Sequence, residues 1–338
     1  MDRPRFVTAM AVGILAFGPV AAGQAPTQTR APRPEARSTW TPPRTPWGDP
    51  DLQGNYTNKD ENSIPLERPS QFAGKSAADV NASEFAELVK RRQQESVERA
   101  PGIGGEQTGA GPVHWYEYYG AQNSRPWLIV DPPDGKIPAL TPDAQTRAAG
   151  LRQARSGRGE SDGAEDRSLY DRCITRGVPG SMMPAIYGNS YQIVQSPGFV
   201  AIRYEMIHET RLIPLDGRAH AGRDIRLYMG DARGRWDGQT LVVETTNLNG
   251  RESADIVGYG SPDRGASQGL RIVERFTPVA PNTIAWSVTL DDARTWTRPW
   301  TFAMNLTKDA SQPVFEYACH EGNYGLTNIL SAARAEEK

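Results

Sequence analysis

The stretch LRIVERFTPVAPNTIAWSVTL, residues 270–290, decides the fold of this chain. Large apolar side chains occupy every second position along residues 283–290, a period typical of a half-buried β-strand, and residues 270–277 form a second strand-like run. Pro281 and Asn282, between the two runs, are turn formers. The stretch therefore predicts a β-hairpin, which is a pair of antiparallel strands.

Similar strand-like runs lie on both sides of this hairpin, and short turn-forming links separate them. Regular spacing of about eight or nine such runs is typical of a meander that closes into a barrel or folds as a β-sandwich. The content of 33 glycines and 27 prolines fits a loop-rich β-protein. The other expected strands are residues 125–130, 191–195, 199–205, 211–215, 240–246, 300–306 and 314–319.

A few helices are expected outside the strands. Residues 83–98 carry one apolar stripe, and Thr141 followed by Pro142 is a typical helix start because Thr caps the first turn. A short C-terminal helix is expected near Leu330.

The N-terminal part predicts export and defines the expected domains. Residues 1–23 combine early arginines, a short apolar run and small residues before a cleavage point, which is typical of a signal peptide. A retained N-terminal anchor is the alternative. Residues 24–46 are expected to form a disordered, proline-rich leader and 47–112 an extension with one helix, while 113–338 hold the barrel domain and its C-terminal helix. The mature protein is expected in the periplasm or secreted.

The chain has only two cysteines, Cys173 and Cys319. Because an exported protein meets oxidising conditions, we expect these two to form a disulfide. A free catalytic thiol at Cys319 is the alternative.

Charge and composition limit the classes of partner. The net charge of −2 and the scattered Lys and Arg give no support for nucleic-acid binding. No later apolar run is long enough for stable membrane insertion. Neither a GxSxG elbow nor a nucleotide-binding glycine fingerprint is present. We expect a small-molecule ligand or substrate and no cofactor; the oligomeric state stays open.

Three strings resemble a family of uncharacterised secreted bacterial proteins. They are WGDPDLQG at Trp47–Gly54, DRC at Asp171–Cys173 and YACHEGNY at Tyr317–Tyr324. This resemblance covers nearly everything after Trp47 and implies a lipocalin-like antiparallel barrel, but it carries no catalytic assignment.

The candidate catalytic residues are His208, His320, Glu205 and Glu321. Histidine titrates near neutrality, and a partly buried Glu with a raised pKa can complement it, which suits proton transfer without a cofactor. The alternative for each histidine is a structural one, holding a loop through hydrogen bonds. Three histidines, His208, His220 and His320, could also bind zinc or iron, but their spacing matches no standard ligand pattern, and our prediction is no metal.

Candidate substrate-binding residues are Arg211 for an anionic group, Trp236 and Trp300 for a flat apolar surface, and Asn323. Structural ion pairing of the arginine and core packing of the tryptophans are the alternatives. The sequence thus favours an exported acid–base enzyme, a lyase, isomerase or hydrolase, acting on a small aromatic, terpenoid or glycosidic compound inside a barrel. A non-catalytic carrier of an apolar molecule and a histidine-ligated metalloenzyme are the alternatives.

Overall fold

The computed structural model describes residues 40–62, 64–99, 124–185, 187–250, 267–311 and 313–337. The predicted signal peptide, most of the predicted leader and the expected start of the barrel domain at residue 113 lie outside these residues. The strands are β1 Gly54–Thr57, β2 Ile129–Asp131, β3 Ser190–Ser196, β4 Phe199–Tyr204, β5 Thr210–Pro214, β6 Asp231–Asp237, β7 Thr240–Thr246, β8 Arg271–Ala280, β9 Thr283–Asp291 and β10 Trp300–Lys308. The α-helices are α1 Ala82–Arg99, α2 Pro142–Ala154 and α3 Tyr324–Glu336.

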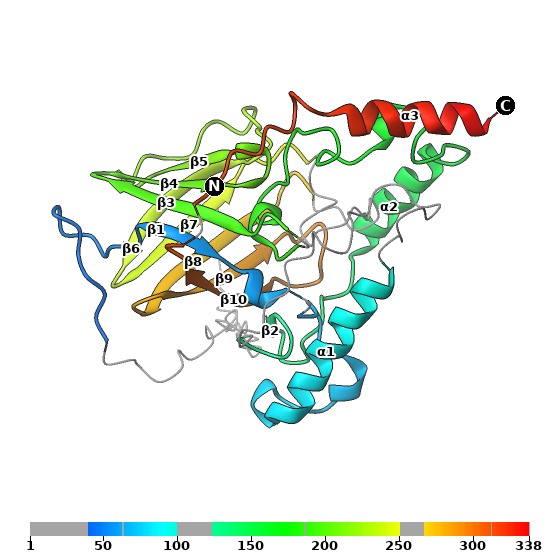
Figure 1. Cartoon of the computed structure of the whole chain (residues 1–338). Coiled ribbons are helices and arrows are strands. Elements are labelled where there is room, and N and C mark those ends of the chain that lie inside the picture. The colour runs from blue at the N-terminus through cyan, green and yellow to red at the C-terminus, as the bar shows by residue number, and fades with distance from the viewer. Residues whose placement is uncertain are drawn as a thin grey trace, which may run out of the picture. The chain divides into compact units, whose positions relative to one another are not determined.

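The strands form one antiparallel sheet that curls into a nearly closed barrel (Figure 1). Their order is β5-β4-β3-β1-β10-β9-β8-β7-β6, and β2 pairs with β10 beside this path. From β3 to β10 the chain is a meander in sequence order. Strand β1 lies between β3 and β10 and pairs with both, so it joins the first strand of the meander to the last. The expected mainly β barrel is confirmed, and the sandwich alternative is not.

The barrel closes between β5 and β6 by side-chain packing, because these two strands are the ends of the hydrogen-bonded order. Gly234 of β6 lies under the side chains of Ile213 and Leu215. A Cβ atom at Gly234 would lie 2.6 Å from Leu215 Cδ2 and 2.8 Å from Ile213 Cγ2. The absence of a side chain at this position therefore lets the two edges approach.

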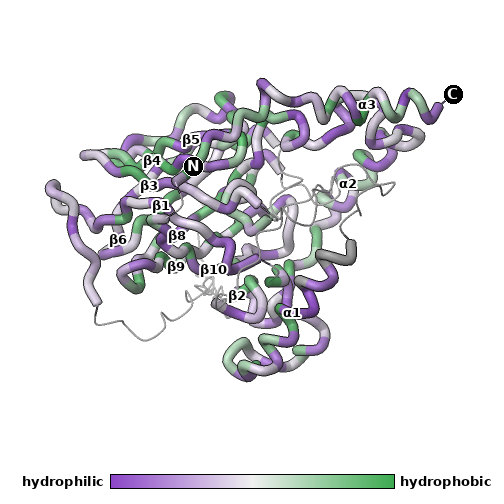
Figure 2. The backbone as a smooth tube through the Cα atoms, viewed as in Figure 1, coloured by the Kyte–Doolittle hydropathy of each residue, from purple (hydrophilic) through white to green (hydrophobic). Residues whose placement is uncertain are grey.

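The hairpin predicted at residues 270–290 is confirmed as β8 and β9, whose buried and half-exposed positions alternate. Figure 2 shows hydrophobic and hydrophilic positions alternating along the strands. The inward positions fill the barrel with large side chains. The largest fully buried side chains include Trp286, Trp300, Tyr191, Tyr204, Phe276 and Phe302.

Two strands of the barrel, β1 and β6, were not predicted from the sequence. Strand β1 lies in the segment predicted to be an N-terminal extension, so part of that extension belongs to the barrel wall. Strand β6 has two small inward residues, Ala232 and Gly234, between charged neighbours, and Trp236 is the one large side chain on that face.

The strand expected at residues 314–319 is not present, and that prediction is wrong. Strand β10 already pairs with β9 on one side and with β1 and β2 on the other, so no free edge of β10 remains for it. The segment is an extended, largely exposed connection, with 61% of Phe315 accessible to solvent.

The helices lie beside one end of the strands (Figure 1). The predicted helix start is confirmed, because Thr141 Oγ1 accepts a hydrogen bond from the Ala144 amide at 3.1 Å at the start of α2. Helix α1 packs its Leu88 against Phe72 and Trp127 in a small second core. None of the described helices has the length and the apolar character that a membrane span requires.

Candidate functional site

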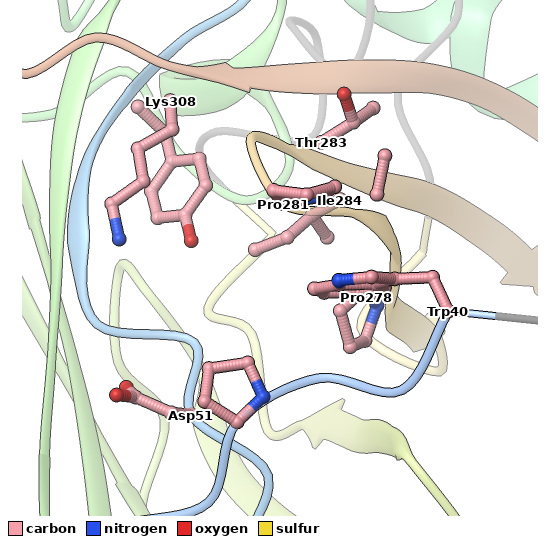
Figure 3. Close-up of a pocket in the computed structure, with 10 residues that line it drawn as sticks. Trp40, Asp51, Pro278, Pro281, Thr283, Ile284 and Lys308 are labelled. Atoms are coloured by element: carbon pink, nitrogen blue, oxygen red, sulfur yellow. The ribbon is translucent and has the colours of Figure 1, made fainter.

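One mouth of the barrel holds a pocket (Figure 3). Tyr56 of β1 is paired with Lys308 of β10, and Pro278 of β8 with Ile284 of β9, so these four lining residues lie near the same end of the sheet. Barrel mouths are common sites for small ligands. The space in the pocket and at its open entrance is about 330 Å³ together, and about 40 Å³ of it can hold the centre of a water-sized molecule. The lining residues are Trp40, Pro43, Asp51, Tyr56, Pro278, Ala280, Pro281, Thr283, Ile284 and Lys308.

The chain before β1 forms the outer wall of the pocket. The Asp51 amide donates a hydrogen bond to the Pro43 carbonyl at 2.8 Å, which fixes these two lining residues against each other. Gln195 of β3 holds the same segment on the barrel, since its Oε1 accepts from the Leu52 amide at 2.6 Å and its Nε2 donates to the Pro50 carbonyl at 3.1 Å. The wall is therefore pinned to the sheet.

Polar and apolar side chains lie on different sides of this pocket. Figure 3 shows Trp40 beside Pro278 on one side, and Asp51 and Lys308 on the other. A ligand between these sides would meet flat apolar rings on one face and charged groups on the opposite edge.

Gly54 determines where Lys308 lies. Its φ of +145° is a conformation that favours glycine, and a Cβ atom here would overlap the Cε atom of Lys308. The Lys308 side chain thus crosses β1, donates from Nζ to the Gln53 carbonyl at 2.8 Å, and places Nζ 5.9 Å from the centre of the Tyr56 ring. The glycine suits the backbone conformation at this point and leaves room for the Lys308 side chain.

The hydroxyl of Tyr56 stays protonated over the physiological range. Burial, and then the nearby charge of Asp51, raise the pKa of Tyr56 to about 12. Asp51 accepts a hydrogen bond at Oδ1 from the Gln53 amide at 2.9 Å. The pocket thus combines a phenol donor, a carboxylate acceptor and an ammonium donor.

Arg211 lies in the barrel interior and not in this pocket. It is 3% exposed, pairs with the buried carboxylate of Glu274, and donates to Thr245 Oγ1 at 2.6 Å. Trp286 Nε1 also donates to Glu274, at 3.3 Å. Burial by itself would lower the pKa of Arg211, but the carboxylate of Glu274 raises it above its ordinary value. The charge of Arg211 is thus compensated by Glu274 within the barrel interior.

The four candidate catalytic residues do not form a buried acid–base centre. His208, His320 and Glu321 are exposed. His208 Nδ1 lies 2.9 Å from the Tyr317 carbonyl oxygen, a contact that holds a loop. Glu205 is half-buried, and its carboxylate accepts from the Ser190 amide at 3.2 Å.

The third candidate metal ligand, His220, lies beside two carboxylates. Its Nδ1 is 3.0 Å from Asp231 Oδ2, and its Nε2 is 3.5 Å from Glu244 Oε1. Within the described ranges, no group of three or more His, Cys, Asp or Glu side chains is placed to hold a metal ion. The structure therefore lends no support to a site built from His208, His220 and His320.

The remaining candidate residues have structural surroundings. Trp300 is 1% exposed and packs edge-on against Trp296, with ring centres 5.6 Å apart, and Trp236 packs partly buried against the main core. Asn323 caps α3 by accepting from the Leu326 amide at 3.2 Å, and it donates to the Asp171 carbonyl at 3.0 Å. The predicted disulfide between Cys173 and Cys319 is confirmed.

The mouth residues were absent from the sequence-based site. Asp51 and Gly54 belong to the WGDPDLQG string, which was noted for its resemblance only. Trp40, Tyr56 and Lys308 show no shared pattern along the chain. Tyr56 and Lys308 are paired across β1 and β10, and this neighbourhood becomes visible once the strand register is known.

Comparison with known proteins adds little to this site. No protein-family model and no curated protein sequence matches the chain. Among solved structures, a secretary abundant heat soluble (SAHS) protein from Ramazzottius varieornatus is similar with a TM-score of 0.24 and 12% identity, over 42% of this chain and 87% of that one. At this level of similarity, the comparison supports no statement about ligand or activity.

Proposed function

We propose that this protein binds a small neutral ring compound with several hydroxyl groups, such as a single sugar ring, in the barrel mouth. The observation that carries the proposal is that Asp51, Tyr56 and Lys308 line one pocket together with Trp40 and Pro278. Hydroxyl groups of a ligand can donate to the carboxylate and accept from the phenol and the ammonium group.

The charges in the pocket favour a neutral ligand. An anion would be attracted by Lys308 but repelled by Asp51. A simple cation would be attracted by Asp51 but repelled by Lys308. A hydroxylated ring also has an apolar C–H face, which suits the side of the pocket that holds Trp40 and Pro278 (Figure 3).

Binding without turnover accounts best for these groups. The packed barrel interior leaves the ligand at the mouth, and the residues expected to transfer protons, His208 and His320, are exposed and lie outside the pocket lining. The carrier hypothesis is therefore preferred to the acid–base enzyme, although the proposed ligand is polar where an apolar one was expected.

We also propose that the protein works outside the cytoplasm. The disulfide between Cys173 and Cys319 supports this, because such bonds persist in oxidising compartments. The signal peptide predicted for residues 1–23 lies outside the described residues.

The binding proposal is tested by saturation-transfer NMR and calorimetry with methyl glucoside as the probe. We expect binding in the millimolar range, and at least about tenfold weaker binding for Trp40→Ala and for the nearly isosteric Asp51→Asn and Tyr56→Phe. Trp47→Ala is the matched control, because Trp47 lies on the same segment, is 37% exposed and is not part of the pocket lining.

Three results would refute the proposal. They are absence of binding, equal affinity in the Asp51→Asn and wild-type proteins, and preferred binding of a zwitterion such as proline, whose two charges would match Asp51 and Lys308. Consumption of the glycoside by the wild-type protein would instead favour the enzyme hypothesis over the carrier.

A further inference from the structure

Three tyrosine hydroxyls and one arginine gather beside the disulfide, away from the residues that line the mouth pocket. The hydroxyl oxygens of Tyr170 and Tyr187 lie 3.4 Å apart, and the Tyr317 hydroxyl is within hydrogen-bonding reach of both. The guanidinium carbon of Arg176 lies 5.4 Å from the centre of the Tyr170 ring. We refer to Tyr170, Arg176, Tyr187 and Tyr317 as the tyrosine–arginine cluster.

The charge of Arg176 is not compensated by a nearby carboxylate. Its side chain is half-buried, and in the described part of the chain it makes no ion pair. Two carboxylates are close in sequence or contact. Asp171 pairs with Arg167 at 3.1 Å, and Glu209 accepts from Thr175 Oγ1 at 2.7 Å and from the backbone amide of Arg176, not from its guanidinium. An unpaired, half-buried guanidinium is a ready partner for an external anion.

The hydroxyls of the cluster are hydrogen-bond donors at neutral pH. Burial, together with hydrogen bonding and proximity to Tyr187, raises the pKa of Tyr317 to about 12. Burial, followed by the hydrogen bond with Tyr187, also raises the pKa of Tyr170 above its ordinary value. Neutral phenols can each donate one proton to an oxygen of a bound ligand.

The backbone around the cluster is held in place, in part by unusual conformations. Ile207 and His208 have φ values of 59° and 46°, which a β-branched residue such as Ile adopts only when its surroundings impose it. This kink brings His208 Nδ1 to the carbonyl oxygen of Tyr317. His208 is therefore a positioning residue for Tyr317, and backbone strain of this kind is concentrated at functional sites.

We propose that the tyrosine–arginine cluster binds a small aromatic carboxylate, with Arg176 as the counter-ion and Tyr170 and Tyr317 as hydroxyl donors. The planar guanidinium matches the two oxygens of a carboxylate, so a bidentate pair can form. The Tyr170 ring, whose centre lies 5.4 Å from the guanidinium carbon, offers apolar surface to an aromatic ring bound beside Arg176. The site is separate from the mouth pocket, and its ligand differs in charge from the neutral ring proposed there.

The test uses benzoate and its neutral isostere benzamide, titrated into the full chain by calorimetry. We expect benzoate to bind, benzamide to bind at least about tenfold more weakly, and Arg176→Gln to lose a similar factor for benzoate. Tyr317→Phe, which removes only a hydroxyl, is expected to weaken benzoate binding and to keep the fold, as checked by circular dichroism. Arg218→Gln, which removes an exposed arginine paired with Asp216, is the matched control.

Four outcomes would overturn the proposal: no benzoate binding, equal affinity for benzoate and benzamide, unchanged affinity in a folded Arg176→Gln protein, or displacement of benzoate by an equal concentration of inorganic phosphate. Methyl glucoside binding is expected to be unaffected by Arg176→Gln, so failure of this proposal is distinguishable from failure of the one for the mouth pocket.

Discussion

Cys173 is bonded to Cys319 across 146 positions of the chain, with the two Cα atoms 5.6 Å apart. Cys173 lies between Tyr170 and Arg176, and Cys319 lies two residues after Tyr317. The bond therefore joins the two segments that supply most of the tyrosine–arginine cluster. Asn323 strengthens the same connection, because its Nδ2 donates to the Asp171 carbonyl.

Removal of this disulfide is expected to lower stability and to loosen the cluster. For the double variant Cys173→Ser/Cys319→Ser we expect a loss of about 2–5 kcal/mol in the free energy of unfolding, because the unfolded chain is no longer cross-linked. Urea denaturation measures the loss. Dithiothreitol should destabilise the wild-type protein and leave the variant unchanged; an equal response of both would show that the bond contributes nothing.

The buried ion pair of Arg211 and Glu274 should respond very differently to single and double replacement. Arg211→Met leaves a carboxylate unpaired in the barrel interior, and we expect a loss of about 3–5 kcal/mol. In Arg211→Met/Glu274→Met both charges are gone, so most of this loss should be recovered. Chemical denaturation of the three proteins makes the comparison. Arg218→Met, at an exposed pair, serves as control and should have little effect; a double variant as unstable as the single one would contradict this account.

Gly234 is expected to be the sensitive point of barrel closure. Gly234→Ala places a methyl group against Leu215 and Ile213, and overpacking of this kind costs about 1–3 kcal/mol. Gly222→Ala is the control, because a Cβ atom there meets no atom within 4 Å. Thermal denaturation compares the two proteins. Adding Leu215→Ala to the Gly234→Ala protein should restore part of the stability; a neutral Gly234→Ala would show that β5 and β6 are not packed this closely.

Glu61 should make stability fall as pH rises. It is 2% exposed and accepts hydrogen bonds from the amides of Ser124 and Asn305. Burial raises its pKa above the ordinary value of 4.5, although those hydrogen bonds and the charge of Arg125 oppose the shift. The folded protein therefore holds this proton more tightly than the unfolded chain. The resulting stability is fully present below about pH 4.5 and is lost as pH rises through the folded value.

Glu61→Gln removes this titration. Relative to the wild type, the variant should gain stability between about pH 4.5 and pH 7, as measured by urea denaturation across that range. The exposed Glu87→Gln is the control. Parallel pH profiles for the Glu61→Gln and wild-type proteins would rule out the assignment.

Much of the barrel was predictable because its strands carry the period-two signal. Strands β3, β4, β8, β9 and β10 bury every second residue, most of them apolar, and β7 is recognisable from its run of β-branched residues. Strand β6 escaped prediction because Trp236 is the one large side chain on its inward face, and Ala232 and Gly234 are too small to mark that face. Residues 314–319 were predicted to be a strand because of their composition, but they form none, since the preceding strand β10 has no free edge.

The candidate site was much less predictable than the fold. Histidines and tryptophans attract attention as chemically active residues, but Trp300 fills the core and His208 holds a loop. The mouth pocket combines Trp40, Asp51 and Tyr56 with Pro278 and Lys308, which are more than two hundred residues away along the chain. No local pattern links such distant positions.

The sequence by itself determined the β class, most of the strands, the helix start at Thr141 and the pairing of the only two cysteines. These features depend on neighbouring residues, or on there being a single pairing to choose. Only the tertiary structure decided that β1 joins β3 to β10, that β5 and β6 close over Gly234, and that Tyr56 meets Lys308. Such choices depend on register and side-chain complementarity between distant segments, and a period along one strand does not specify its partner.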